Sequence, residues 1–119
     1  MTTRQLGQAG EERAVQFLIQ QGYQILARNF LAAGGELDIV ARTNKTLVFV
    51  EVKARAYTAF GGPLAAVTPA KQKRLVLAAA QYLKVTATKF DSIRFDVVCV
   101  LPEGIEHIQH AFVPGRMTL

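Results

Sequence analysis

Apolar residues recur along the chain with two different spacings, which predict helices and strands. From about residue 6 to residue 21 they return every three or four positions, and Gly22 follows as a C-terminal stop, so we predict an amphipathic helix. Thr68 and Pro69 have the form of an N-cap followed by a first-turn proline. A wide apolar arc after them predicts a second helix that extends to about residue 84.

Shorter apolar runs, bounded by polar or glycine-rich links, predict strands. The third run is apolar on both faces before it reaches Glu51, so we expect it to be central in a sheet. The predicted strands cover residues 23–30, 37–41, 47–52, 93–101 and 105–113.

The polar link at residues 43–46 is predicted to join the second and third strands as a tight hairpin turn. If its two central residues form the turn, each residue n faces residue 89 − n. Directly opposed residues share one face of the sheet. This register places Asp38 opposite Glu51, and Glu36 opposite Lys53.

Asp38 and Glu51 would repel each other across the hairpin unless a cation or a proton lay between them. A divalent metal would supply that cation, because Mg²⁺ prefers oxygen ligands and binds through one or two carboxylates. Lys53 projects from the same side of the strand as Glu51, where its ammonium can orient a water or stabilise charge on a phosphate. We therefore predict Asp38, Glu51 and Lys53 as catalytic residues.

Glu11 falls inside the apolar arc of the first helix, between Val15 and Leu18. An unpaired buried carboxylate is costly, so Glu11 is expected to be paired, protonated or near a metal. An acid favoured by the helix dipole, or paired with an Arg at the edge of the core, explains the position equally well. Both interpretations stay open at this point.

Composition and charge add little to the functional argument. The chain has 119 residues, half of them hydrophobic, which suits a single domain over residues 1–119. The net charge of +5 favours polyanionic partners but is common in other proteins. A solvated helix face also explains several of the basic residues. Candidate nucleic-acid contacts are Arg55 and Tyr57 after the third strand, and Lys71, Lys73 and Arg74 on the second helix.

Several classes of site lack support in the sequence. The single cysteine, Cys99, cannot form an internal disulfide, and no apolar run approaches the roughly 18 residues that cross a bilayer, so we expect a cytoplasmic protein without a membrane partner. His107 and His110 are three apart on a predicted strand and should face opposite sides, which favours surface or packing roles. Serine-nucleophile, Walker and paired-cysteine motifs do not occur.

The order of elements resembles the PD-(D/E)XK nuclease superfamily, with an inward Glu on the first helix, an Asp on the second strand and Glu-x-Lys on the third. Leu37 occupies the place of the Pro in the superfamily's name. A closer resemblance, over nearly the full chain, is to the YraN family of bacterial nuclease-like proteins. Its segments are Gly7-x-x-Gly-Glu11, Gly35-Glu-Leu-Asp38, Leu47-Val-Phe-Val-Glu-Val-Lys53, Phe60-Gly61 with Val67-Thr-Pro-Ala-Lys-Gln-x-Arg-Leu75, and Arg94-Phe-Asp-Val-Val98.

The resemblance implies an α/β, restriction endonuclease-like core in the order αβββαββ, with a mixed central sheet of about five strands flanked by two helices. It also implies Mg²⁺ or Mn²⁺ as cofactor, and Lys53 beside the attacking water. The Gly7-x-x-x-Glu11 start, the Gly22 stop and the set of Asp38 with Glu51-Val52-Lys53 also resemble archaeal Holliday-junction resolvases. This resemblance leaves open whether the chain forms a homodimer, as resolvases do. The implied metal ligands are Glu11, Asp38, Glu51 and the Val52 carbonyl.

Three functions are compatible with these features. The first is a metal-dependent endonuclease that hydrolyses phosphodiester bonds in DNA, with branched or structured DNA as the expected substrate. The second is a non-catalytic nucleic-acid-binding module that has the nuclease-like fold and the basic surface. The third is a protein-interaction domain in which the charged residues of the hairpin pair only with one another.

Overall fold

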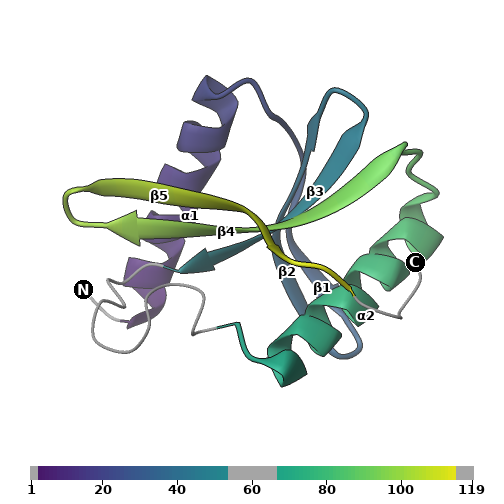
Figure 1. Ribbon diagram of the computed structural model, residues 1–119. Helices are drawn as coiled ribbons and strands as arrows, with labels where there is room; N and C mark the ends of the chain where they lie inside the picture. The colour runs from purple at the N-terminus through teal and green to yellow at the C-terminus, as the bar shows by residue number, and fades with distance from the viewer. Residues whose placement is uncertain (1–2, 54–66, 115–119) are drawn as a thin grey trace.

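The computed structural model describes residues 3–53 and 67–114. The elements follow the predicted order αβββαββ, which confirms the expected α/β fold class. They are α1 (Thr3–Gln20), β1 (Gln24–Ala32), β2 (Gly35–Thr43), β3 (Thr46–Lys53), α2 (Pro69–Thr86), β4 (Ser92–Leu101) and β5 (Gly104–Phe112) (Figure 1).

The five strands form one mixed sheet in the order β1-β2-β3-β4-β5. Neighbouring strands are antiparallel except for β3 and β4, which are parallel. A parallel pair needs a crossover connection, and α2 lies in the segment that connects β3 to β4. As predicted, β3 is the central strand.

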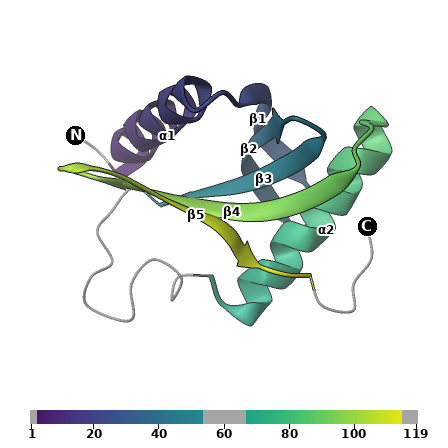
Figure 2. The same cartoon turned by 45° about the horizontal axis from the view of Figure 1, so that its top comes forward.

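The two helices cover opposite faces of the sheet (Figures 1 and 2). Successive side chains of a strand point to opposite faces, so each strand contributes to two cores. On β3, Val48 and Val50 pack with α1 residues such as Leu18, whereas Leu47 and Phe49 pack with α2. Neither helix, within the described part of the chain, is both long and apolar enough to cross a membrane.

The predicted helix ends are present in the structure. Gly22 adopts a positive φ of 92°, which a residue with a side chain rarely adopts. The Thr68 side chain caps α2 by accepting a hydrogen bond from the Lys71 N–H at 3.2 Å. The helix continues two residues beyond the predicted end and stops at Ala87, which has a left-handed φ of 53°.

The β2–β3 hairpin has the predicted register. Thr43 pairs with Thr46, and the pairing continues to Ile39 and Val50. Asn44 adopts a positive φ of 54° in the turn. The ladder between β2 and β3 ends at the Ile39–Val50 pair, one position before Asp38 and Glu51 would face each other. The predicted opposed pairs of charged residues are therefore not ladder partners.

Candidate metal centre

The candidate site lies where β2 separates from β3. If the ladder continued with the same register, Leu37 would pair with Val52, but Leu37 pairs with Phe30 of β1 instead. The Val52 N–H donates to Asp38 Oδ2 at 2.8 Å. A side-chain carboxylate thus replaces the backbone acceptor that the ladder would have supplied. This bond holds Asp38 beside β3, although the two strands have already separated.

On the β1 side, the pairing skips one position beside Asp38. The pairing of β1 with β2 passes from Arg28–Ile39 to Phe30–Leu37 and leaves out Asn29 and Asp38. Asn29 has a positive φ of 52°, a conformation that Asn tolerates better than most residues. Asp38 therefore lies beyond the end of the β2–β3 ladder, at a position that the β1–β2 pairing skips without a change of register.

Three carboxylates gather at this break. Glu11 of α1, Glu36 and Asp38 each offer an oxygen, and these oxygens lie within 4.8 Å of one another. The Asn29 amide is assigned with its nitrogen toward the acids, since the opposite assignment would face its oxygen only with acceptors. In this orientation Asn29 donates to Glu11 Oε2 at 3.0 Å and to Glu36 Oε1 at 2.7 Å.

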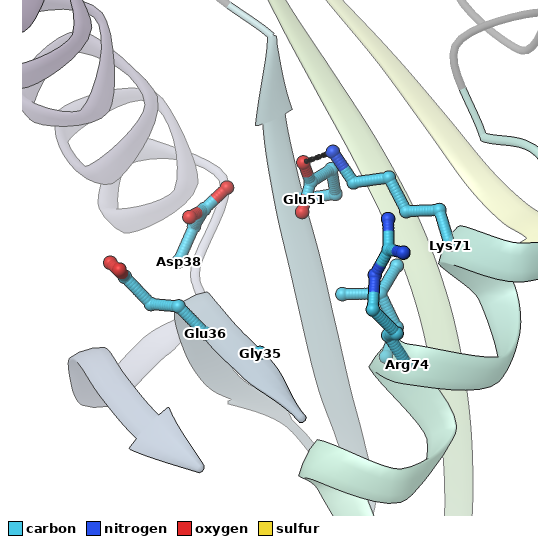
Figure 3. A pocket seen from close by; sticks show the side chains of 7 residues that line it. Gly35, Glu36, Asp38, Glu51, Lys71 and Arg74 are labelled. Carbon is cyan, nitrogen blue, oxygen red and sulfur yellow. Dashed lines mark ion pairs between the residues drawn. The ribbon is translucent and has the colours of Figure 1, made fainter. Parts of the chain in front are cut away.

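Glu51 lies on the other side of the break and carries two ammonium partners. Its side chain is buried, with 7% of the residue exposed. The Glu51 Oε1 atom lies 3.1 Å from Lys53 Nζ and 2.7 Å from Lys71 Nζ. Figure 3 shows Glu36 and Asp38 on β2, Lys71 and Arg74 reaching in from α2, and Glu51 between them. The pocket therefore has an acidic wall and a basic wall.

The charges of the two walls do not cancel at Asp38. Burial and, after it, the neighbouring Glu51 carboxylate raise the pKa of Asp38 to about 7, because the hydrogen bond from the Val52 N–H offsets only part of their effect. Burial also raises the pKa of Glu11, despite the hydrogen bond from Asn29. Both acids are held in surroundings that oppose their ionisation. An added positive charge would relieve this.

The two lysines are shifted in opposite directions. Burial and the neighbouring Lys71 lower the pKa of Lys53. Burial would lower the pKa of Lys71 as well, but its bonds to Glu51 and Lys53 outweigh burial and raise it. Of these two lysines, Lys71 is therefore the one whose surroundings favour the charged form.

The donor set fits a hard divalent cation. Asp38 Oδ2 is bonded to Val52 and Glu51 Oε1 to the two lysines, but the second oxygen of each has no hydrogen-bond or ion-pair partner within residues 3–53 and 67–114. Carboxylate oxygens are the ligands that Mg²⁺ and Mn²⁺ accept in proteins. Glu11 and Glu36 supply further oxygens within 4.8 Å of the Asp38 carboxylate, whereas Glu51, a predicted ligand, does not belong to this close group.

Not every predicted site residue lies at this pocket. Lys73 lies elsewhere, beside Pro69 and Phe112. Arg55 and Tyr57 fall outside the described residues. The prediction that Glu36 faces Lys53 is wrong, because the ladder ends earlier and Lys53 bonds to Glu51 instead.

Two features of the site were not expected from the sequence. One is the place of Glu36 beside Glu11, although residues two apart on a strand, such as 36 and 38, share a face. The other is the ion pair between Lys71 and Glu51, which depends on how α2 packs against the sheet. Lys71 was expected only as a nucleic-acid contact.

A second buried acid lies near α1 and was also not expected. Asp96 of β4 is 2% exposed. It accepts two hydrogen bonds from Arg94, both at 2.8 Å, and one from the His110 N–H at 3.2 Å. The His107 Nε2 atom lies 2.7 Å from Asp96 Oδ2. Although burial opposes it, the bonds from His107 and Arg94 lower the pKa of Asp96.

The comparison with known proteins identifies a family. The model of the uncharacterised protein family UPF0102 matches residues 10–100, and the chain belongs to this family, which confirms the resemblance to the YraN family. A UPF0102 protein of Cupriavidus pinatubonensis is 48% identical over 112 residues, which span 93% of this chain and 87% of the relative. One from Syntrophomonas wolfei is 50% identical over 113 residues, with 92% of this chain and 98% of the relative covered.

Proposed function

We propose that this member of the UPF0102 family is a metal-dependent endonuclease that hydrolyses phosphodiester bonds in DNA, with branched or structured DNA as substrate. The observation that carries the proposal is the break in the sheet at Asp38. There the chain brings Asp38 and Glu51 to one pocket and leaves one oxygen of each without a partner among the described residues. Lys53 lies beside them.

Each side chain of the pocket has a distinct part in this proposal. Asp38, Glu51 and Glu11 would hold Mg²⁺ or Mn²⁺, together with the Val52 carbonyl that the family resemblance implies. A bound dication lowers the pKa of a water and neutralises charge on the phosphate. The Lys53 ammonium lies where it can orient the attacking water or bind a phosphate oxygen. Arg74, on the opposite wall, can bind a further phosphate oxygen.

The test is cleavage of branched, flapped, single-stranded and duplex DNA in Mg²⁺, in Mn²⁺ and in EDTA. The wild-type protein should cleave at least one substrate only when a dication is present. Asp38→Asn and Glu51→Gln should each reduce the rate by about a thousandfold or more. Asp91→Asn is the matched control, because Asp91 is an exposed aspartate whose nearest ion-pair partner, Lys45, is 3.9 Å away. Equal cleavage by Asp38→Asn and Asp91→Asn would refute the proposal.

A nucleic-acid-binding module without catalysis is the second candidate, and the basic wall of the pocket favours it. Lys53, Lys71 and Arg74 can bind phosphates whether or not hydrolysis follows. Binding that weakens steeply with salt, with no cleavage in either dication, would select this function. The third candidate, in which the charged residues only pair with one another, is less well supported. Within the described segments, no Lys or Arg forms an ion pair with Glu36 or Asp38.

A further inference from the structure

Lys71 occupies an unusual place for a lysine of a helix surface. It lies in the first turn of α2, where Thr68 caps the helix by accepting a bond from its N–H. Its side chain extends across the pocket to Glu51 of β3, and the Nζ to Oε1 distance of 2.7 Å is the shortest ion pair of the pocket. One end of Lys71 is therefore fixed by the helix cap, while its charged end closes the gap between the helix and the sheet (Figure 3).

The positive charge at Glu51 exceeds what one carboxylate needs. Lys53 and Lys71 contact the same Glu51 oxygen, and two ammoniums at one atom repel each other. On the opposite wall, Glu11, Glu36 and Asp38 stand close together without a lysine partner among the described residues. The chain thus holds surplus positive charge next to a surplus of negative charge.

We propose that Lys71 is the counter-ion of Glu51 in the metal-free protein, and that it leaves Glu51 when a dication binds and transfers to a phosphate of the nucleic acid. The inference rests on the proposed function, which supplies the dication. Lys71 suits this exchange because its ammonium is a compact charge on a flexible four-carbon stem. Rotation of the side chain alone can carry it toward Arg74, which lines the same pocket.

Lys53 is less suited to the exchange than Lys71. Lys53 follows Glu51 by two residues on the same strand, and only 15% of its side chain is exposed. The Lys71 side chain is 25% exposed and comes from a different element. The strand therefore keeps Lys53 beside Glu51, while Lys71 can move without disturbing the sheet.

The exchange makes a prediction about metal affinity, since competition for Glu51 is reciprocal. If the Lys71 ammonium and a dication exclude each other from Glu51, removing the ammonium must increase the affinity of the site for the dication. The measurement is Mn²⁺ affinity of the full chain without nucleic acid, by electron paramagnetic resonance. Lys71→Met should bind Mn²⁺ about tenfold more tightly than wild type. Lys71→Arg, which restores the charge, should stay near wild type.

Lys84→Met is the matched control, because Lys84 is an exposed lysine in the last turn of the same helix. It removes the same charge far from Glu51 and should leave Mn²⁺ affinity unchanged. Unchanged or weaker binding by Lys71→Met would overturn the exchange, and weaker binding would show that Lys71 only orients Glu51. As a test in the wild-type protein, the side-chain ¹⁵N signal of Lys71 should shift on Mg²⁺ titration. A static signal also overturns the exchange.

Failure of the exchange and failure of the proposed function give different results. If wild type cleaves DNA but Lys71→Met binds Mn²⁺ no more tightly, only the exchange is wrong. If neither protein binds Mn²⁺, both proposals are wrong. If only Lys71→Met binds Mn²⁺, Lys71 competes with the dication as inferred, and the native chain is not a metal-dependent nuclease.

Discussion

Asp38 and Asp96 are two aspartates of the same sheet that are largely shielded from solvent, and their surroundings shift their pKa values in opposite directions. The pKa of Asp38 is raised to about 7 and that of Asp96 is lowered. Both experience burial, which favours the neutral acid. The difference lies in the partners, because the Arg94 guanidinium forms an ion pair with Asp96, whereas the nearest charges to Asp38 include those of other carboxylates. Burial alone therefore does not identify a functional acid.

Both aspartates also lie at irregularities of the strand pairing. The β4–β5 register shifts between Phe95 and Val97, and the His110 N–H points to Asp96. At the other aspartate, the Val52 N–H points to Asp38. A broken ladder thus supplies a backbone donor to a carboxylate in each case. What separates the two regions is charge balance, and only the region at Asp38 retains a deficit of positive charge that a ligand can supply.

The largest expected effect is on stability at Asp96. Asp96→Asn should lower the free energy of unfolding by about 3 kcal/mol at pH 7, because the largely buried Arg94 guanidinium loses the negative charge that compensates it. Urea unfolding followed by circular dichroism measures the change. A loss below about 1 kcal/mol would mean that this network is not a structural ion cluster. The comparison of the two aspartates would then fail.

Asp38→Asn should change the free energy of unfolding in the opposite direction and stabilise the protein at neutral and higher pH. The raised pKa means that folding favours protonated Asp38, so wild-type stability falls as pH rises from about 4 to about 7. The Asn variant carries no charge there and still offers an oxygen to the Val52 N–H. At pH 8 in EDTA it should be more stable than wild type by roughly 2 kcal/mol, and this advantage should vanish near pH 4. Urea unfolding at both pH values provides the measurement.

A destabilised Asp38→Asn at pH 8 would contradict the charge deficit at this site. The Asp96 carboxyl should behave in the reverse manner. Because its pKa is lowered, its contribution to stability is present above pH 4 and disappears as the pH falls through its folded-state value. The same urea series on Asp96→Asn checks this sign.

The sequence was sufficient to predict the hairpin and to bring Asp38 and Glu51 to one pocket. Strand alternation and the polar link at 43–46 determine the register that the structure shows from Thr43–Thr46 to Ile39–Val50. The same alternation puts residues 38 and 51 on one side of the hairpin. These inferences succeed because they depend on local geometry, which repeats along a strand.

Contacts that depend on irregular backbone or on helix packing were not predictable in this way. Glu36 accepts a hydrogen bond from Asn29, whose backbone has a positive φ, which Asn permits but does not require. Asp96 meets both the His107 side chain and the His110 backbone N–H because the pairing of β5 with β4 is irregular there. Lys71 reaches Glu51 only through the packing of α2.

Dication binding should stabilise the folded protein by less than the Asp96 and Asp38 substitutions change its stability, but the effect is specific to the candidate metal site. A ligand that binds only the folded state at ten times its dissociation constant adds about 1.4 kcal/mol, which raises the melting temperature by roughly 5 °C. Wild type should gain this increase in Mn²⁺, and Asp38→Asn should not. His107→Gln, which weakens the Asp96 network while retaining a hydrogen-bond donor, should keep the gain. Thermal melts in Mn²⁺ and EDTA measure it, and an equal shift in all three proteins would show that Mn²⁺ binds elsewhere.

The smallest expected effect concerns Asn29, which is the main hydrogen-bonding partner of the acidic wall. Asn29→Gly removes the amide that bridges Glu11 and Glu36 but relieves the positive φ of 52°. These two effects oppose each other, so unfolding free energy should change by no more than about 0.5 kcal/mol. The pKa of Glu11 should rise further, because the Asn29 bond lowers it.

Asn29→Ala, which loses the amide and keeps the unfavourable backbone, should be about 1 kcal/mol less stable than Asn29→Gly. Urea unfolding and carboxyl ¹³C titration measure both quantities. If Asn29→Gly instead lost more than about 2 kcal/mol, the acids of the pocket would be a structural network like that of Asp96, satisfied by the chain itself, and a bound cation would no longer be needed to explain them.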